Sequence, residues 1–275
     1  MTAKIQSKVY RFAVYAGAFF SMAVLLLIVG YILIKGIPHL TPELFAWEYN
    51  SNNVSMMPSI INTLLMTMIS LIVCVPLGIG AAIYLTEYAK RGSSLVKIVR
   101  MTAETLSGIP SIIYGLFGSL FFVVALKMGL SLISGALTLS IMVLPTIMRT
   151  TEEALLAVPS SYREGSFGLG AGRLRTTFKV VLPSAVPGIL SGVILAVGRI
   201  VGETAALIYT AGTVAKVPDS VLDSTRTLAV HMYTISSEGL YINQSYATAV
   251  VLLVVVLGIN GLSSFIAKRI GRSHT

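Results

Sequence analysis

RTTEEALLAVPSSYREGSFGLGAGRLRTTFKVVLPS, residues 149–184, is a basic, glycine-broken stretch that joins two apolar segments of the chain. Its opening EEALLAV contains good helix formers, and Pro159 ends that run. SSYREGSFGL can begin another short helix, with Ser160 or Ser161 as its N-cap. Glycines then break the chain in a way that suits a sharp turn, at Gly168, Gly170 and Gly172.

The second half of this stretch, GRLRTTFKVVLP, combines cations with an apolar face. Leu174, Phe178 and Val181 recur at helical spacing, and Pro183 marks the return to an apolar segment. Residues 149–184 therefore predict a helix, a turn and a helix that lie beneath a membrane. Such a loop can be a handle for a soluble partner or an amphipathic segment resting on anionic lipid, and the residues alone leave both open.

The chain as a whole is strongly apolar: 55% of its 275 residues are hydrophobic, 11% are charged, and the mean hydropathy is +0.85. Soluble domains carry about 25% charged residues, so lipid is the expected solvent. A membrane span needs roughly 20 apolar residues. Six stretches qualify, although Gly and Pro interrupt the third and fourth: 12–34, 59–86, 101–126, 130–148, 186–211 and 246–267. We expect an all-α, polytopic membrane helical bundle of about six helices, with residues 1–275 as one domain.

Basic residues are distributed unevenly over the segments between these spans. If the N-terminus is cytoplasmic, fifteen of the 20 Lys and Arg fall on the inner side and four on the outer side, with Arg199 inside a span. Cytoplasmic loops carry this excess in membrane proteins, so both termini and residues 149–184 are predicted to be cytoplasmic. The net charge of +9 then reflects membrane topology, and no nucleic-acid partner is expected.

Missing residue patterns disfavour several function classes. The single cysteine permits no disulfide within the chain, and the three histidines form no HExxH or other metal pattern. Both aspartates lie in a predicted outer loop and GxSxG is absent, which disfavours an intramembrane protease. An ion-coupled carrier often shows inverted repeats, and none is evident. Without GxxxxGK[ST] the chain lacks an ATP-binding loop, so we expect no cofactor or metal in it.

The predicted fifth span holds two opposite charges, Arg199 and Glu203, one helical turn apart. A central arginine costs about 2.5–3.5 kcal/mol on insertion scales. Arg before Glu is the less favourable order for a helix pair, so the partners could instead be Glu104 or Arg149 near the inner ends of other spans. Arg199 either lines a pathway for an oxyanion, which a guanidinium matches bidentately, or forms an interhelical salt bridge, and a gate could be both.

Residues 164–183 resemble the loop of binding-protein-dependent ABC importer permeases, which reads E-A-A, three residues, G, nine residues, I, one residue, L-P. Every spacing fits, with three small substitutions. The matching positions are Glu164, Gly165, Ser166, Gly170, Val180, Leu182 and Pro183. The resemblance implies the MetI-like ABC importer permease fold and docking of this loop into a groove on a cytoplasmic ATPase. The chain would then be a transporter subunit and not an enzyme.

Two further segments narrow the resemblance to the permeases of phosphate importers. GRIVGETAALIYTAG looks like their G-R-x-x-G-E-T-A-x-L, and ETLSGIPSIIYGLFG looks like their E-x-L-x-G-I-P-S-I-V-Y-G-L-F. TLAVHMYTI is closer to the A-type than to the C-type permease of such systems. The resemblance implies pathway or gating roles for Arg199, Glu203, Glu104, Thr204 and Ser107. Arg149 joins them as a candidate ion-pair partner.

The same resemblance implies partners and a location. They are a homologous C-type permease that forms a heterodimer, two copies of a P-loop ATPase that bind ATP and magnesium, and an extracytoplasmic phosphate-binding protein, all at a bacterial cytoplasmic (inner) membrane. The expected function is inward movement of inorganic phosphate by alternating access. Sulfate or molybdate as cargo is the alternative, because Arg199 alone does not separate oxyanions. An ion-coupled secondary carrier is less favoured.

Overall fold

A computed structural model describes residues 2–90 and 92–272, and these residues form only helices and loops. Arg91, one of the cations assigned to the inner side, lies outside the described residues. The helices are α1 Thr2–Gly36, α2 Met57–Ile83, α3 Ser94–Ser107, α4 Ser111–Gly118, α5 Leu132–Leu156, α6 Ser160–Gly168, α7 Arg173–Thr176, α8 Leu182–Val201, α9 Ala205–Thr210, α10 Leu228–Ser237 and α11 Ile242–Arg272. Tighter or wider helical turns extend or link them at Ile37–His39, Pro42–Phe45, Tyr84–Tyr88, Ser119–Ala125 and Thr177–Val181. The all-α prediction is confirmed.

Helical stretches that are long and apolar enough to cross a membrane occur five times in the described residues. They are Ser7–His39, Met57–Tyr88, Leu132–Leu156, Arg173–Val201 and Ile242–Phe265. The expected span 101–126 is wrong as one straight helix, because α3 and the segment Ser111–Ala125 are bent by 104°. α5 continues past the expected end of 130–148, so EEALLAV belongs to this helix and not to a separate one.

Two breaks in the chain produce short helices. Ser107 ends α3, and Pro110 precedes α4 in an extended conformation with ψ 141°. Proline has no amide donor, and it disfavours helical backbone at the residue before it, which accounts for the first break. The second break, at residues 202–204, separates α8 from α9. The expected span 186–211 is therefore wrong beyond Val201.

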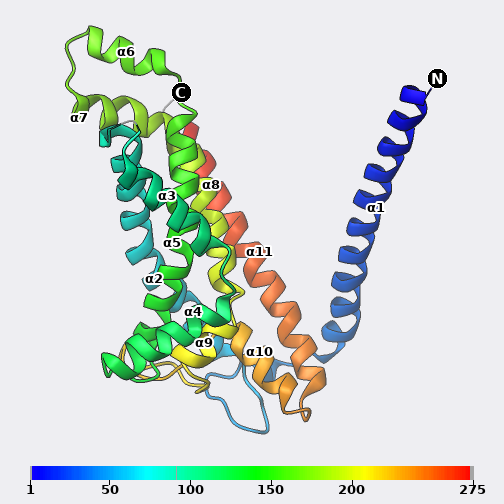
Figure 1. Cartoon of the computed structure of the whole chain (residues 1–275). Helices are drawn as coiled ribbons and strands as arrows, with labels where there is room; N and C mark the ends of the chain where they lie inside the picture. The colour runs from blue at the N-terminus through cyan, green and yellow to red at the C-terminus, as the bar shows by residue number, and fades with distance from the viewer. Residues whose placement is uncertain (1, 91, 273–275) are drawn as a thin grey trace.

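The helices that follow these breaks, α4 and α9, pack against each other at the end of the bundle opposite α6 and α7 (Figure 1). Gly115 permits this contact, because a Cβ at that position would lie 2.7 Å from the Cα of Ala206. Small residues at helix contacts in membranes let two backbones approach closely. The two broken segments, far apart in sequence, are thus brought together in one region.

α5 lies at the centre of the bundle, packed on α2 and α8 (Figure 1). Its core contains fully buried large side chains from all three helices. They are Met66, Leu139, Met142, Ile147 and Ile200. A displacement of either end of α5 should therefore also displace α2 and α8, because close-packed interiors transmit strain.

α1 leaves the rest of the bundle and contacts α11 near one end only (Figure 1). There the rings of Tyr31 and Tyr246 meet edge-on with centroids 5.8 Å apart. From Ser7 to Lys35, α1 has no buried residue, and Phe12 and Phe19 are among its exposed side chains. Such a helix requires lipid or another membrane chain around it.

The first turns of α1 and the last turns of α11 lie at the same end of the molecule as α6 and α7 (Figure 1). This arrangement agrees with the expectation that both termini share a side with residues 149–184. The side of the membrane that this end faces stays a prediction from the basic residues.

Candidate functional site

The loop with the E-A-A spacing, here called the α6–α7 loop (residues 159–183), turns at Gly170. Its φ of +81° lies in the left-handed region, where only glycine is free of strain. No heavy atom lies within 4 Å of the position that a Cβ would take there, so the backbone and not space requires the glycine. The hydroxyls of Ser166 and Thr176, 2.8 Å apart, join the two sides of the turn. The predicted helix–turn–helix is present.

The predicted serine cap of this loop is wrong. Pro159 precedes α6 and Ser160 is already helical, without a side-chain cap. A proline just before a helix pre-sets the backbone and has no amide hydrogen to leave unpaired, so it takes the place of a polar cap.

The α6–α7 loop presents an exposed surface with both polar and apolar residues. Glu164 and Gly165 are exposed on α6, and Leu169 at the turn is 91% exposed. Exposed apolar side chains also include Phe167, Leu174 and Phe178. Leu182 and Pro183 are half-buried at the start of α8, where the loop rejoins the bundle. Several exposed apolar side chains on one short loop favour an interaction site.

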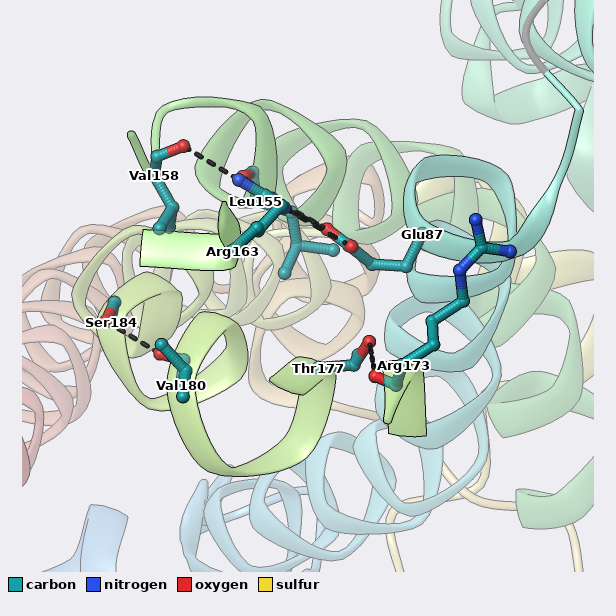
Figure 2. A network of polar contacts seen from close by, with 8 residues as sticks. All are labelled: Glu87, Leu155, Val158, Arg163, Arg173, Thr177, Val180 and Ser184. Atoms are coloured by element: carbon teal, nitrogen blue, oxygen red, sulfur yellow. Dashed lines mark hydrogen bonds and ion pairs between the residues drawn. The ribbon is translucent and has the colours of Figure 1, made fainter. Parts of the chain in front are cut away.

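Arg163 anchors α6 to the bundle (Figure 2). Its Nη2 donates to Oε1 of Glu87 at 2.6 Å and to the carbonyl oxygen of Leu155 at 2.9 Å. Its Nη1 donates to the carbonyl oxygen of Val158, also at 2.9 Å. The side chains of Arg163 and Glu87 are only 20% and 9% exposed. Charge-assisted hydrogen bonds of this geometry are among the strongest in proteins.

This anchor connects the α6–α7 loop to two central helices, because Glu87 lies in the turn that extends α2 and Leu155 lies in the last turn of α5. Neither member of the pair stands out in the sequence: Arg163 is one of the fifteen cations on the predicted inner side, and Glu87 belongs to no motif. The two residues are 76 positions apart, and no local spacing rule relates them.

Glu104 and Arg149 belong to a cluster of charges where the second half of α3 lies against the last turns of α5. Arg149 lies 4.0 Å from Glu104 and 3.1 Å from Glu153, and Arg100 pairs with Glu152. These side chains line a cavity of about 300 Å³. Glu104 and Arg149 are therefore wrong as partners of Arg199 and Glu203: among the described residues they lie 4.0 Å from each other, and neither lines the groove of Arg199.

Arg199 lies half-buried in the last turn of α8 and faces an open groove of about 590 Å³. Side chains of α5, α8 and α11 form the groove: Thr146, Ser191, Ile194, Leu195, Gly198, Arg199 and Asn260. Within residues 2–90 and 92–272, no carboxylate lies within ion-pair distance of Arg199. An arginine in a membrane span usually finds a partner, so an unpaired one that faces an open groove favours a pathway over a salt bridge.

Glu203 caps a helix instead of forming the expected salt bridge with a cation. Its Oε1 accepts a hydrogen bond from the backbone amide of Ala206 at 3.1 Å, which caps the first turn of α9. Thr204 occupies the break itself, with φ −124° and ψ −54°, and makes no side-chain cap. At the other break, the Ser107 hydroxyl donates to the carbonyl oxygen of Glu104 at 2.8 Å. Glu203, Thr204 and Ser107 thus shape the two breaks, and their contact with cargo stays a prediction.

A membrane helical bundle with an exposed loop anchored to its central helices, and with an unpaired cation that faces a groove from the last turn of a span, has the architecture of a transport subunit. The family described as "Binding-protein-dependent transport system inner membrane component" matches residues 74–272, which include the α6–α7 loop, both breaks and Arg199. The chain belongs to this family: it is a permease, the membrane component of an ABC importer, and not an enzyme.

The chain is similar in sequence to permeases of phosphate transport systems. The chain is 36% identical over 210 residues to the phosphate transport system permease protein PstA of Pasteurella multocida, covering 76% of this chain and 74% of the relative. It is 31% identical over 265 residues to PstC of Mesorhizobium japonicum, covering 86% and 79%. A probable ABC transporter permease of Bacillus subtilis, YqgI, is 33% identical over 233 residues, covering 79% of each chain. The resemblance to A-type phosphate permeases is confirmed.

Solved structures share the fold. A chain of a bacterial alginate ABC transporter matches with a TM-score of 0.68 at 16% identity, covering 96% of this chain and 97% of that chain. The inward-facing MetNI methionine ABC transporter matches with a TM-score of 0.58 at 22% identity, covering 80% and 94%. The predicted MetI-like permease fold is confirmed, and at these identities the likeness concerns the fold alone.

Proposed function

We propose that this chain is the A-type permease subunit of a phosphate importer and forms half of the pathway for inorganic phosphate. The observation that carries the proposal is the unpaired guanidinium of Arg199, which faces an open groove from the last turn of a membrane helix. A guanidinium offers five N–H donors in a planar fork that matches oxyanions. The names of the PstA relatives support phosphate as that oxyanion.

The open groove also supports a second permease as partner. A groove that carries Arg199 and Asn260 cannot face lipid without leaving polar groups unsatisfied. A homologous C-type permease that covers this groove would close a polar pathway between the two chains. On this proposal the heterodimer lies in the cytoplasmic membrane of a bacterium, with both termini in the cytoplasm, and receives phosphate from an extracytoplasmic binding protein.

The exposed α6–α7 loop supports docking of a P-loop ATPase, with one copy on each permease. The ATPase pair would hold ATP and magnesium, and this chain would hold no cofactor. When the ATPases close, α6 moves with them, and the Arg163–Glu87 anchor passes that movement to α2 and α5. Because α5 packs on α8, the movement reaches the helix that carries Arg199 and changes access to the groove.

Uptake by the reconstituted transporter tests the proposal. Proteoliposomes that contain both permeases, the ATPase and the binding protein should accumulate labelled phosphate with ATP, and unlabelled sulfate or molybdate should not compete. Arg199→Gln should reduce uptake to background while the complex still assembles. Lys97→Gln is the matched control, because it removes an exposed cation of α3 far from the groove and should leave uptake unchanged.

Two outcomes would overturn the proposal. Preferential transport of sulfate or molybdate would assign the chain to another oxyanion. Normal phosphate uptake by Arg199→Gln would show that the guanidinium has no part in the pathway.

A further inference from the structure

The last helix, α11, contains a polar side chain near the end of its apolar stretch. From Ala249 to Gly261, Asn260 is the sole polar side chain. Lys268 and Arg269 follow about 12 Å further along the helix, at 1.5 Å per residue, which is close to half of the roughly 30 Å hydrocarbon core. Asn260 therefore lies inside the apolar span Ile242–Phe265, within the hydrocarbon core.

Asn260 faces the groove of Arg199. Its amide atoms lie 3.7 and 3.8 Å from the position that a Cβ on Gly198 would take, so it approaches α8 directly beside Arg199. Its Oδ1 is buried and accepts no hydrogen bond from any described residue. A buried acceptor without a donor is unfavourable, so a ligand that donates a hydrogen bond to Oδ1 would stabilise this site.

The hydroxyl of Ser191 in the same groove is a second acceptor. Its proton is already donated to the carbonyl oxygen of Pro187 at 3.0 Å, so only its lone pairs face a ligand. The groove thus offers donors from Arg199 and the Asn260 amide and an acceptor from Ser191, and a turn of the Asn260 amide group would bring its buried Oδ1 to a ligand as a second acceptor. Among the residues that line it, none is a carboxylate.

We infer that Asn260 is a specificity-determining residue of the pathway and that, with Ser191, it selects a tetrahedral oxyanion that carries a proton. Hydrogen phosphate both accepts hydrogen bonds from Arg199 and donates one to Oδ1 of Asn260. Sulfate and molybdate carry no proton at neutral pH, so they leave both acceptors unpaired. A site built to receive a hydrogen bond rejects a ligand that cannot donate one. The inference rests on the proposed function and names how its cargo is selected.

Equilibrium dialysis of labelled phosphate against the intact permease–ATPase complex in nanodiscs tests this inference. The binding protein is left out so that its own selectivity does not enter. Wild type should bind labelled phosphate, and unlabelled phosphate should displace it whereas sulfate should not. Asn260→Leu should weaken phosphate binding about tenfold or more, and the ratio of sulfate to phosphate affinity should rise, because the unpaired acceptor is gone. Asn243→Leu, an exposed asparagine of the same helix outside the groove, is the matched control.

A second variant covers the case in which Asn260→Leu fails to assemble. Asn260→Asp keeps the acceptor oxygens and adds negative charge, so it should weaken binding of both anions while retaining or increasing the preference for phosphate. An unchanged sulfate-to-phosphate ratio in Asn260→Leu, or a lost preference in Asn260→Asp, would overturn the inference. Phosphate uptake by wild type and its loss in Arg199→Gln would still stand in that case, so the two proposals fail separately.

Discussion

Removing the guanidinium of Arg163 should detach α6 from the bundle. Arg163→Ala removes hydrogen bonds to the carboxylate of Glu87 and to the carbonyl oxygens of Leu155 and Val158. It leaves the Glu87 carboxylate 9% exposed and without its cation. Because Glu87 cannot reach water without a movement of the chain, the cost falls on the contact between α6 and the central helices.

The structure sets the size of this effect. Breaking a buried ion pair by removal of one partner costs about 3–5 kcal/mol. Arg149→Ala is the matched control, since Arg149 is 58% exposed and its partners Glu104 and Glu153 are 74% and 62% exposed. Pairs as exposed as these contribute about 0–1 kcal/mol. The difference of about 3 kcal/mol corresponds to a change of about 100-fold in the local opening equilibrium.

Hydrogen–deuterium exchange of the purified transporter measures that equilibrium directly. Amides of residues 160–168 should exchange about 100-fold faster in Arg163→Ala than in wild type, and Arg149→Ala should match wild type within a few-fold. The double variant Arg163→Met, Glu87→Met should recover much of the protection, because no unpaired charge remains. Equal exchange in Arg163→Ala and Arg149→Ala would refute the reasoning.

Three other changes have defined outcomes. Gly170→Val places a β-branched residue at φ +81°, which should destabilise the turn by about 1–3 kcal/mol. A pull-down of the ATPase should then show weaker docking. Gly165→Ala is the control and should keep full docking, because no heavy atom lies within 4 Å of the added Cβ. Glu203→Ala removes the cap on the amide of Ala206 and should destabilise α9 by about 0.5–2 kcal/mol, whereas Glu203→Gln should retain most of the cap. Hydrogen exchange of the α9 amides measures both effects. Equal losses of protection in the two variants would contradict a capping role. Burial, with nearby Arg226 as the lesser cause, lowers the pKa of His231 to about 3. Between about pH 6.5 and pH 3 the imidazole is therefore protonated in the unfolded chain but neutral in the folded one, and the free energy of unfolding should fall as the pH drops through that range. Thermal unfolding of His231→Phe should be less sensitive to pH over that window, and an identical pH profile would count against burial of a neutral imidazole.

Local patterns in the sequence determined the all-α membrane fold and the α6–α7 loop. An apolar stretch of about 20 residues forms a membrane-spanning helix, because backbone groups in lipid can form hydrogen bonds only within the helix. This rule depends on the segment itself and not on the helices that pack around it. Gly170 was predicted to allow a sharp turn, and its φ of +81° shows why glycine is required. The spacing from Glu164 to Pro183 identified the family, because it depends on positions along one segment.

Helix boundaries were less determined by sequence. Gly and Pro interrupt the expected span 101–126, yet hydropathy continues across them, and only the structure shows the bend of 104° between α3 and Ser111–Ala125. Hydropathy likewise continued through residues 202–204, where the carboxylate of Glu203 caps a new helix. Apolar character reports the surroundings of a segment and does not report its direction.

Tertiary structure alone decided which distant residues act together. Arg163 meets Glu87 across 76 positions, and Asn260 meets the groove of Arg199 from a different helix. It also left Arg199 without Glu104 or Glu203, although both had suitable charge. Charge and spacing within one segment give only the candidates for a contact; the packing of α5, α8 and α11 fixes which of them lie within a few ångströms, and hydrogen bonds and ion pairs form only at that range.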